Sequence, residues 1–388
     1  MNNSLRWKVR LILTVLLLLA ILPACQPSEK EEVVRIGVLA ILSGNETYIS
    51  LSGQPTVDGA TLALQEIEQA GWITIGDTTY RLELIIADDG GTPETAVAAA
   101  NNLINQEGVV ALIGPQFSSN AIPVGAVAEQ ARIPMISPMA TAVDLTVGRD
   151  YVFRIGFIDS FQGQVMARFA MSDLDATRAA IYYNVGEAYS RGIAEIFRSV
   201  FTEAGGEIVA FESYTADALD FTEALTRIQT ADPDVLFLPN YPAELVPLVQ
   251  EARALGIETT FLGSDTWNSL AFGEIPELTG SFYATHWNQE SDAATSRAFV
   301  AAFQAAYPDK ALRITSAMTY DALGLIVAAI RDQGAATPEA IRNGLANVRD
   351  YSGVSGQIVY EGSGDPIKSA VIMQIQGDSA SFYRLVNP

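Results

Sequence analysis

The stretch VVALIGPQFSS, residues 109–119, joins a short apolar strand to the start of a helix through a turn that contains glycine and proline. Strands that are apolar throughout are typical of parallel sheets, because such strands are buried on both faces. We therefore predict a strand over 109–113 and a helix from about Ser119 to Ala131, as one step of a strand–helix alternation.

The same alternation continues on both sides of this stretch. In the first series the predicted strands are 33–39, 82–87, 109–113 and 135–137, and the predicted helices are 57–69, 92–108 and 119–131. In the second series the predicted strands are 179–183, 208–211, 235–238 and 261–263, and the predicted helices are 187–204, 221–230 and 243–255. Two consecutive series predict an α/β protein with two doubly wound parallel-sheet lobes.

Beyond residue 287 the pattern becomes helical and then ends in strands. Helices are predicted at 296–306, 316–331 and 338–346, and hairpin-like strands near 356–360 and 370–376. No low-complexity spacer separates the two α/β series, so we expect lobes that pack against each other.

The beginning of the chain has the features of an export signal. Three basic residues precede an apolar run over 11–22, which ends in the segment LPAC, residues 22–25. Twelve apolar positions are too few to span a bilayer and suit a cleavable leader. The segment resembles the lipobox of bacterial lipoproteins, so we predict a signal peptide over 1–24, lipidation at Cys25 and a charged tether over 25–32. The alternative is an ordinary secretory leader with a chance cysteine; both place the protein outside the cytoplasm.

The charge of the chain limits its partners. It carries 23 Lys and Arg against 45 Asp and Glu, a formal net charge of −22, and loss of a leader with three basic residues leaves about −25. An acidic surface repels phosphate backbones, so we expect no nucleic-acid partner. Cys25 is the only cysteine, and its acylation would leave no free thiol, so we expect no disulfide.

The residue types also argue against an enzyme. His286 is the only histidine, which excludes a site with several histidine ligands and leaves one candidate base for a serine hydrolase. The chain has no G-x-S-x-G, Walker or G-x-G-x-x-G motif. Asp88 and Asp89 are adjacent in a strand, so they point to opposite faces and cannot act as a dyad. We expect no catalytic activity, no cofactor and no metal.

Candidate binding residues follow the predicted strands, where ligands bind in open parallel sheets. In the first series, Ser118 follows strand 109–113 and the segment Met139–Thr141, with Ala140 between, follows strand 135–137. Hydroxyls, free N–H groups and a helix N-terminus suit an anion, although Ser118 or Ser119 could instead only cap the helix.

In the second series, the candidates bear a carboxyl and phenol groups. Tyr189 opens a helix, Tyr241 follows strand 235–238, and Asp265 follows strand 261–263. For Asp265 the alternative is a helix N-cap. Anion donors on one lobe, and a carboxylate with two tyrosines on the other, suit a zwitterion.

Several motifs together resemble one known family over residues 33–388. They are IGVLAILSG (36–44), DGATLALQEIEQAG (58–71), VVALIGPQFSS (109–119), ARIPMISPMAT (131–141), FRIGFIDSFQG (153–163), AIYYNVGEAYSRG (180–192), PDVLFLPN (233–240), TYDA (319–322) and YSGVSG (351–356). In this order and spacing they resemble the periplasmic leucine/isoleucine/valine-binding proteins, the type I solute-binding components of ABC importers.

The resemblance implies two lobes, joined by three crossovers, that close on a small solute. In such proteins the positions of Ser118, Met139 and Thr141 hold the α-carboxylate of an amino acid. The positions of Tyr189 and Asp265 face its ammonium. The position of Tyr241 lines the pocket.

The resemblance also implies a division of the chain and a set of partners. Residues 33–157 and 287–366 are expected in the first lobe, and 158–286 and 367–388 in the second. The expected partners are an amino acid of the branched-chain or a related type, ABC permease subunits and a membrane reached through the lipid anchor, and we expect a monomer.

Departures from the family concern the side-chain pocket. Ser52 replaces a pocket aromatic residue, and Phe117 occupies a position where relatives can carry a disulfide cysteine. Trp267 and Trp287 could be pocket wall or core, and His286 is expected at the hinge or the surface. One alternative function stays open: a ligand-sensing receptor of the same fold that binds an amide or other small metabolite. A secreted hydrolase is a further alternative, but it would need a nucleophile paired with a base, and the single histidine argues against it.

Overall fold

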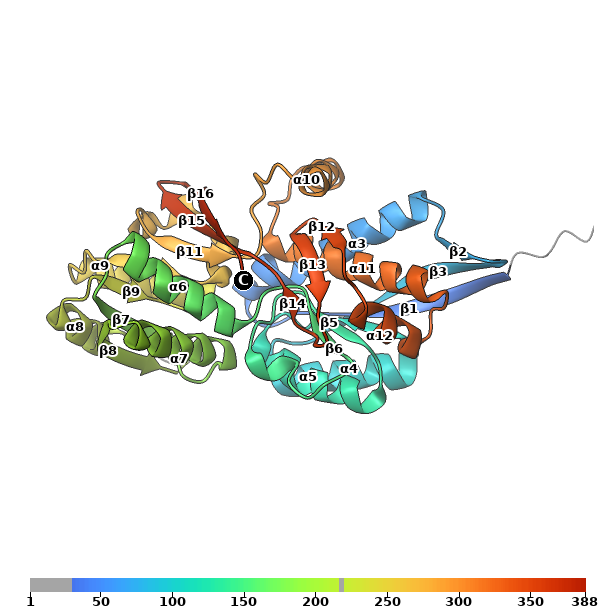
Figure 1. Cartoon of the computed structure of the whole chain (residues 1–388), viewed down its shortest axis with the longest axis horizontal. Helices are drawn as coiled ribbons and strands as arrows, with labels where there is room; N and C mark the ends of the chain where they lie inside the picture. Colours follow the sequence, from blue (N-terminus) through green and yellow to red (C-terminus); the bar gives the residue numbers. More distant parts are fainter. Residues whose placement is uncertain (1–29, 216–219) are drawn as a thin grey trace, which may run out of the picture.

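The computed structural model describes residues 30–215 and 220–388, which form two α/β lobes lying side by side (Figure 1). The first lobe has strands β1 (Lys30–Ala40), β2 (Ile73–Ile75), β3 (Thr78–Asp88), β4 (Ala111–Ile113), β5 (Met135–Ser137) and β6 (Val152–Arg154). Its helices are α2 (Glu46–Tyr48), α3 (Gln54–Gln69), α4 (Pro93–Asn102), α5 (Ser118–Ala131), α10 (Ala294–Ala306), α11 (Ile314–Gln333) and α12 (Pro338–Ala346). The six strands form one sheet in the order β2-β3-β1-β4-β5-β6.

The second lobe is built around a seven-stranded sheet. Its strands are β7 (Arg178–Asn184), β8 (Glu207–Tyr214), β9 (Val235–Phe237), β10 (Thr260–Gly263), β11 (Phe282–Thr285), β15 (Ala370–Gln376) and β16 (Ser379–Val386). Its helices are α6 (Asp159–Asp173), α7 (Ala188–Glu203), α8 (Thr222–Ala231) and α9 (Pro242–Ala254). The sheet order is β16-β15-β11-β10-β9-β7-β8. A small sheet of β12 (Tyr351–Gly353), β13 (Gly356–Tyr360) and β14 (Pro366–Ile367) lies beside the first lobe.

The predicted architecture of two parallel-sheet lobes is confirmed, with corrections at the edges. β2 pairs antiparallel with β3, and β15 and β16 extend the second sheet antiparallel to β11. The strand predicted at 370–376 therefore pairs with β11 and β16 and does not form a hairpin with β13. β1 begins at Lys30, so the last three residues of the predicted tether belong to a strand, because β3 supplies a parallel partner for them.

Local sequence signals explain where α4 begins and ends. Thr92 caps its N-terminus in a capping box, with Pro93 at the first helical position. The helix continues into one π-helical turn over Leu103–Glu107 and stops at Gly108, whose φ of 67° is in the left-handed region that glycine tolerates.

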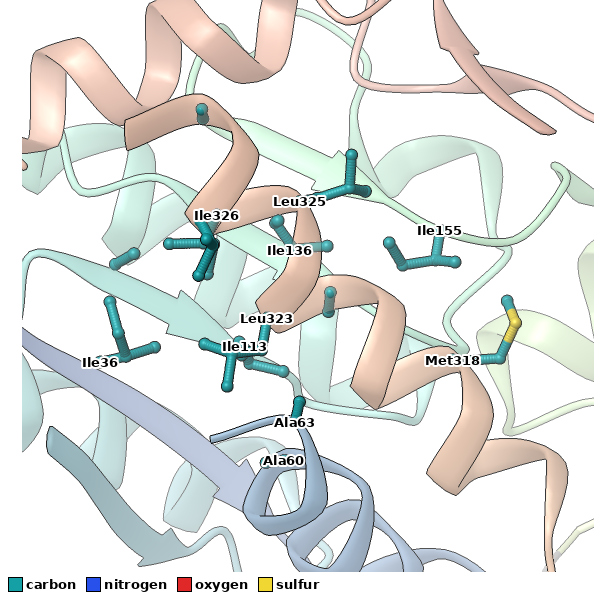
Figure 2. Close-up of a cluster of buried hydrophobic side chains, with 14 of the residues drawn as sticks. Ile36, Ala60, Ala63, Ile113, Ile136, Ile155, Met318, Leu323, Leu325 and Ile326 are labelled. Atoms are coloured by element: carbon teal, nitrogen blue, oxygen red, sulfur yellow. The ribbon is translucent and has the colours of Figure 1, made fainter. Parts of the chain in front are cut away.

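The sheet of the first lobe is covered by core residues on both faces, from α3, α10, α11 and α12 on one and from α4 and α5 on the other. Figure 2 shows side chains of α11, including Leu323, Leu325 and Ile326, over strand residues such as Ile113 and Ile136. Among residues 30–215 and 220–388, α11 is the one helix long and apolar enough to span a membrane, but 78% of its apolar window is buried within the protein. This burial is expected of a core helix.

The chain passes between the lobes three times. The first crossover, 155–158, joins β6 to α6; the second, 286–293, joins β11 to α10; and the third, 368–369, joins β14 to β15. Because each crossover is only a short stretch of irregular backbone, the two lobes can rotate about them as rigid units.

Candidate functional site

A cavity lies between the lobes, at the carboxyl ends of strands from both sheets. The empty space within it, its opening to solvent included, is about 490 Å³. Five of the predicted binding residues line it: Ser118, Met139, Tyr189, Tyr241 and Asp265. The other lining residues are Tyr48, Leu51, Ser52, Gln116, Phe117, Pro242, Thr266, Ser269 and Thr315.

On the first lobe, Ser118 is the first residue of α5 and does not cap it. The N-cap position is Phe117, and no side chain caps this helix, so the alternative capping role of Ser118 and Ser119 is wrong. The Ser118 hydroxyl instead accepts a hydrogen bond from the backbone N–H of Ala142 at 3.3 Å. The cavity therefore meets a helix N-terminus together with this hydroxyl, a combination that attracts anions.

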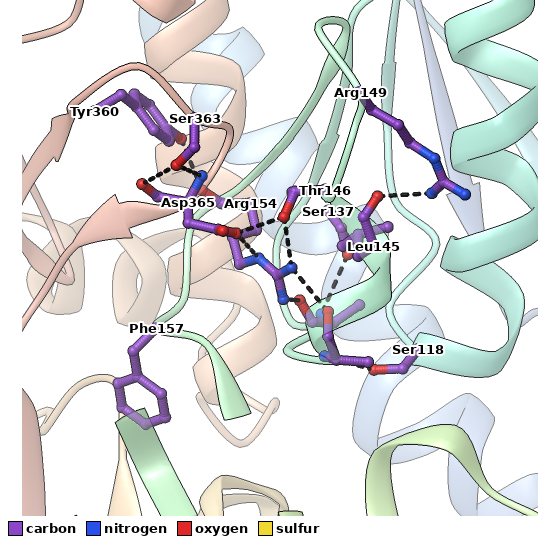
Figure 3. Close-up of polar contacts among 12 residues, drawn as sticks. Ser118, Ser137, Leu145, Thr146, Arg149, Arg154, Phe157, Tyr360, Ser363 and Asp365 are labelled. Carbon is purple, nitrogen blue, oxygen red and sulfur yellow. Dashed lines mark hydrogen bonds and ion pairs between the residues drawn. The ribbon is translucent and has the colours of Figure 1, made fainter. Parts of the chain in front are cut away.

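Hydrogen bonds from buried residues fix the turn that carries Met139. Ser137 accepts a hydrogen bond from the N–H of Ala140 at 3.1 Å, and the buried Arg154 donates to the carbonyls of Ala140 (3.1 Å) and Ala142 (2.8 Å). Figure 3 shows Arg154 between this turn and Asp365, whose Oδ1 accepts from Nε at 2.6 Å. These bonds fix the orientation of the peptide groups that follow β5.

Two of the predicted binding residues do not reach the cavity. Ala140 and Thr141 are buried and lie behind its wall, because Arg154 and the first turn of α6 hold this part of the turn inside the protein. The carbonyl of Thr141 accepts from the N–H of Asp159 at 2.9 Å. The backbone groups predicted at Ala140 and the hydroxyl predicted at Thr141 therefore do not line this cavity.

On the second lobe, Asp265 presents a buried carboxylate to the cavity. Its Oδ1 accepts hydrogen bonds from the Tyr189 hydroxyl (2.7 Å) and from Gln162 Nε2 (2.9 Å), and its Oδ2 lies 3.3 Å from His286 Nε2. The N-cap alternative is wrong, since Ser264 occupies that position and no side chain caps the turn. Burial alone would raise the pKa of Asp265, but the interaction with His286 and the hydrogen bonds from Tyr189 and Gln162 outweigh it and lower the pKa below the usual value.

A second carboxyl group, that of Asp159, lies next to this site. It is the first residue of α6 and fully buried, and neither of its oxygens accepts a well-formed hydrogen bond from the described residues. Burial raises its pKa to about 7, and the neighbouring charge of Asp265 acts in the same direction. The site therefore concentrates negative charge, which favours a cationic group. Asp159 was not among the predicted site residues. The signal in the sequence that could have indicated it is an acidic residue in the first turn of a helix that follows a strand, β6.

Aromatic rings close the cavity on its outer side. The ring of Phe117 stacks on that of Tyr241, with centroids 4.5 Å apart, and Tyr48 meets Phe117 edge to face at 4.8 Å. Tyr189 also packs against Tyr241 at 5.2 Å. The stacking of Phe117 on Tyr241 joins the two lobes across the opening.

Polar contacts join the lobes as well. Ser119 of α5 donates to the carboxylate of Glu187, just before α7. Arg313 donates to the carbonyl of Ser269 at 2.8 Å on the opposite side of the opening. Together with the aromatic contacts, these bonds describe a closed arrangement of the lobes.

The structure also places Trp267, Trp287 and His286, whose positions the sequence left open. Trp267 is fully buried in the core of the second lobe, and Trp287 is buried in the core of the first, so both are core residues. His286 lies in the second crossover, as expected of a hinge residue, and the surface alternative is wrong because it is 1% exposed. Cys25 lies outside the described residues, within which no cluster of potential metal ligands occurs.

Two closed α/β lobes, with a helix N-terminus and the Ser118 hydroxyl facing a carboxylate across a small cavity, are the architecture of a solute-binding protein. A family model described as periplasmic binding protein matches residues 33–380, and the chain belongs to this family. The family is extracytoplasmic, which agrees with the predicted location.

Individual relatives narrow the comparison. The chain is 29% identical over 336 residues to the Leu/Ile/Val-binding protein BraC3 of Rhizobium johnstonii, covering 86% of this chain and 88% of the relative. Its structure is similar to the leucine-binding protein LivK of Thermotoga maritima, with a TM-score of 0.82 and 28% identity over 92% of this chain and 99% of the other.

A third relative was solved with its ligand. It is the branched-chain amino acid transporter substrate-binding protein LivJ of Streptococcus pneumoniae in complex with isoleucine, with a TM-score of 0.82 and 29% identity over 92% of this chain and 100% of the other. The resemblance that the sequence motifs indicated is thus confirmed.

Proposed function

We propose that this protein captures an α-amino acid with an apolar side chain between its lobes and delivers it to an ABC importer. The observation that carries the proposal is that Ser118 of one lobe and Asp265 of the other face the same cavity. A ligand with both an anionic and a cationic group would join these two walls and so stabilise the closed arrangement.

The chemistry of the two walls gives the ligand its orientation. Its carboxylate faces Ser118 and the N-terminus of α5, where a hydroxyl and the helix dipole favour negative charge. Its ammonium faces Asp265, which is ionised and accepts charge-assisted hydrogen bonds. Each such bond contributes about 1.5–3 kcal/mol.

The rest of the lining favours an apolar side chain. Leu51, Met139, Phe117 and Tyr241 are among the lining residues and present carbon surface to the cavity. The names of the relatives agree with this inference, since they refer to leucine, isoleucine and valine. We therefore expect a branched-chain or similar amino acid as the ligand.

The same proposal includes how the protein is attached and divided. Cys25 carries the lipid anchor after removal of residues 1–24, and the partners are ABC permease subunits that receive the ligand from a monomer. Residues 33–157 and 287–366 form the first lobe, and 158–286 and 367–388 the second. β15 and β16, which pair with β11, support the last assignment.

The test is a binding measurement on wild type and Asp265→Asn with a panel of amino acids, amides, short peptides and sugars. We expect L-leucine or L-isoleucine to raise the melting temperature of the wild type; at 100 times Kd the free energy of unfolding rises by about 2.7 kcal/mol. Asp265→Asn should weaken binding by about 10- to 150-fold, the equivalent of one charge-assisted bond.

Asp309→Asn is the matched control, because Asp309 is exposed and lies outside the three crossovers. It should bind like the wild type. Equal affinity of the wild type and Asp265→Asn for amino acids would remove Asp265 from the site. A response only to sugars or other uncharged solutes would refute the proposed ligand class.

A further inference from the structure

His286, the only histidine of the chain, lies between the hinge and the ligand site. Its Nδ1 accepts a hydrogen bond from the backbone N–H of Phe157 in the first crossover at 3.3 Å. Its Nε2 lies 3.3 Å from Oδ2 of Asp265. The ring also packs on the ring of Phe157, with centroids 3.8 Å apart. One side chain therefore contacts two crossovers and the carboxylate that faces the cavity.

These contacts define the protonation state of the ring. Because a backbone N–H can only donate, Nδ1 must be the unprotonated nitrogen, and the hydrogen of a neutral ring must be on Nε2. Nε2 then donates to Asp265, as Tyr189 and Gln162 do. Three neutral donors hold the carboxylate in place, and its full negative charge is left for a cationic ligand.

The space around the ring is restricted by the hinge itself. A Cβ on Gly156 would lie 2.6 Å from Cε1 of His286, so the first crossover approaches the ring as closely as only glycine allows. Closure of the lobes changes the backbone angles of the crossovers. The bond from Phe157 to His286 therefore depends on how far the lobes are closed.

We propose that His286 is a positioning residue for ligand capture: its neutral ring ties the hinge to Asp265, so closure on an ammonium-bearing ligand requires the unprotonated ring. Protonation would place a hydrogen on Nδ1 against the N–H of Phe157 and would neutralise the charge that the ligand needs. The inference rests on the proposed function, because it assigns Asp265 to the ammonium of the ligand.

The charged groups around the ring act in both directions. Asp265 favours the imidazolium, whereas Arg154 of β6 and Lys368 of the third crossover disfavour it. Burial is the largest effect and brings the pKa of His286 below its usual value in the closed protein. His286 also lies at the edge of a groove that Trp287 and Lys368 line.

The sign of the pH dependence follows from this difference. In an open form with the usual histidine pKa of about 6.5, closure expels a proton at acidic pH, so affinity falls as the pH falls. Between pH 7.5 and 5.5 this effect lowers the affinity for L-isoleucine by about tenfold. Asp159, whose pKa is about 7, titrates in the same range and adds to the effect, so variants at His286 must separate the two.

The experiment combines two variants with direct observation of the ring. His286→Gln keeps an amide donor that reaches Asp265 and cannot be protonated, so it should bind within about threefold of the wild type at pH 7.5. Its affinity should lack the roughly tenfold fall between pH 7.5 and 5.5 that is due to His286. His286→Asn is too short to reach Asp265 and should bind about tenfold more weakly at every pH. Nitrogen NMR on the detergent-purified full chain, made without a histidine tag, observes a single histidine.

In the ligand-bound wild type we expect the Nε2–H tautomer at pH 7; without ligand, the ring should titrate at higher pH than in the complex. An Nδ1–H tautomer or an imidazolium in the complex at pH 7 would overturn the role of His286. An unchanged pH profile in His286→Gln would do so too. Failure of every amino acid to bind would instead refute the proposed function.

Discussion

Replacement of Arg154 by Met tests the hydrogen bonds that hold the turn after β5, which carries Met139. The side chain is fully buried and donates four hydrogen bonds: to Asp365 Oδ1 (2.6 Å), to the carbonyls of Ala140 (3.1 Å) and Ala142 (2.8 Å), and to Thr146 Oγ1 (3.1 Å). Met keeps much of the volume and removes all four donors. The change therefore isolates the polar contribution from the packing contribution.

The magnitude follows from what is left behind. Removal of one partner of a buried ion pair costs about 3–5 kcal/mol, because the other charge and the freed carbonyls remain away from water. Asp365 is one-quarter exposed, so water compensates it in part, and the lower half of that range is expected. Ligand binding should weaken as well, since the turn that follows β5 loses its support.

The assay is urea unfolding of wild type and Arg154→Met, with Asp365→Asn as the matched control. Asp365→Asn keeps an oxygen acceptor and leaves three bonds of Arg154 intact, so its free energy of unfolding should fall by only about 1 kcal/mol. A loss below about 1 kcal/mol in Arg154→Met would refute the reasoning that this arginine anchors the turn.

Two further predictions concern a buried acid and the lipid anchor. The pKa of Asp159 is raised by burial to about 7, so its contribution to stability is present at low pH and is lost as the pH rises through about 7. Asp159→Asn should therefore raise the melting temperature of the ligand-free protein at pH 8 and change it little at pH 4; an equal effect at both values would contradict the burial of an ionisable group. Cys25→Ser should release the protein from membranes in cell fractionation, and continued membrane association of the variant would argue against the anchor.

The sequence was sufficient for the architecture and for the main residues of the site. Short apolar strands between helices predicted both sheets, and the strand ends predicted Ser118 and Asp265, because parallel strands bring their carboxyl ends to one edge. The antiparallel edge strands were not predicted, since β15 lies 85 residues beyond the end of β11 in the chain and its pairing is a tertiary contact.

The details of the site depended on contacts between distant residues. Gln162 reaches Asp265 across 103 positions of sequence, and no local pattern indicates this pairing. Tyr48 and Phe117 pack together within the first lobe, but the stacking of Phe117 on Tyr241 forms only because the lobes close. Thr141 was expected in the cavity because it follows a strand, but the turn directs it toward α6.

The most direct test of the two-sided clamp is a calorimetric comparison of three matched ligands. L-isoleucine carries both charged groups, 2-methylbutylamine lacks the carboxylate, and 3-methylpentanoate lacks the ammonium. If Ser118 and Asp265 hold opposite ends of the ligand, each truncated compound binds at least tenfold more weakly than L-isoleucine. Equal affinity for either truncated compound would contradict the account.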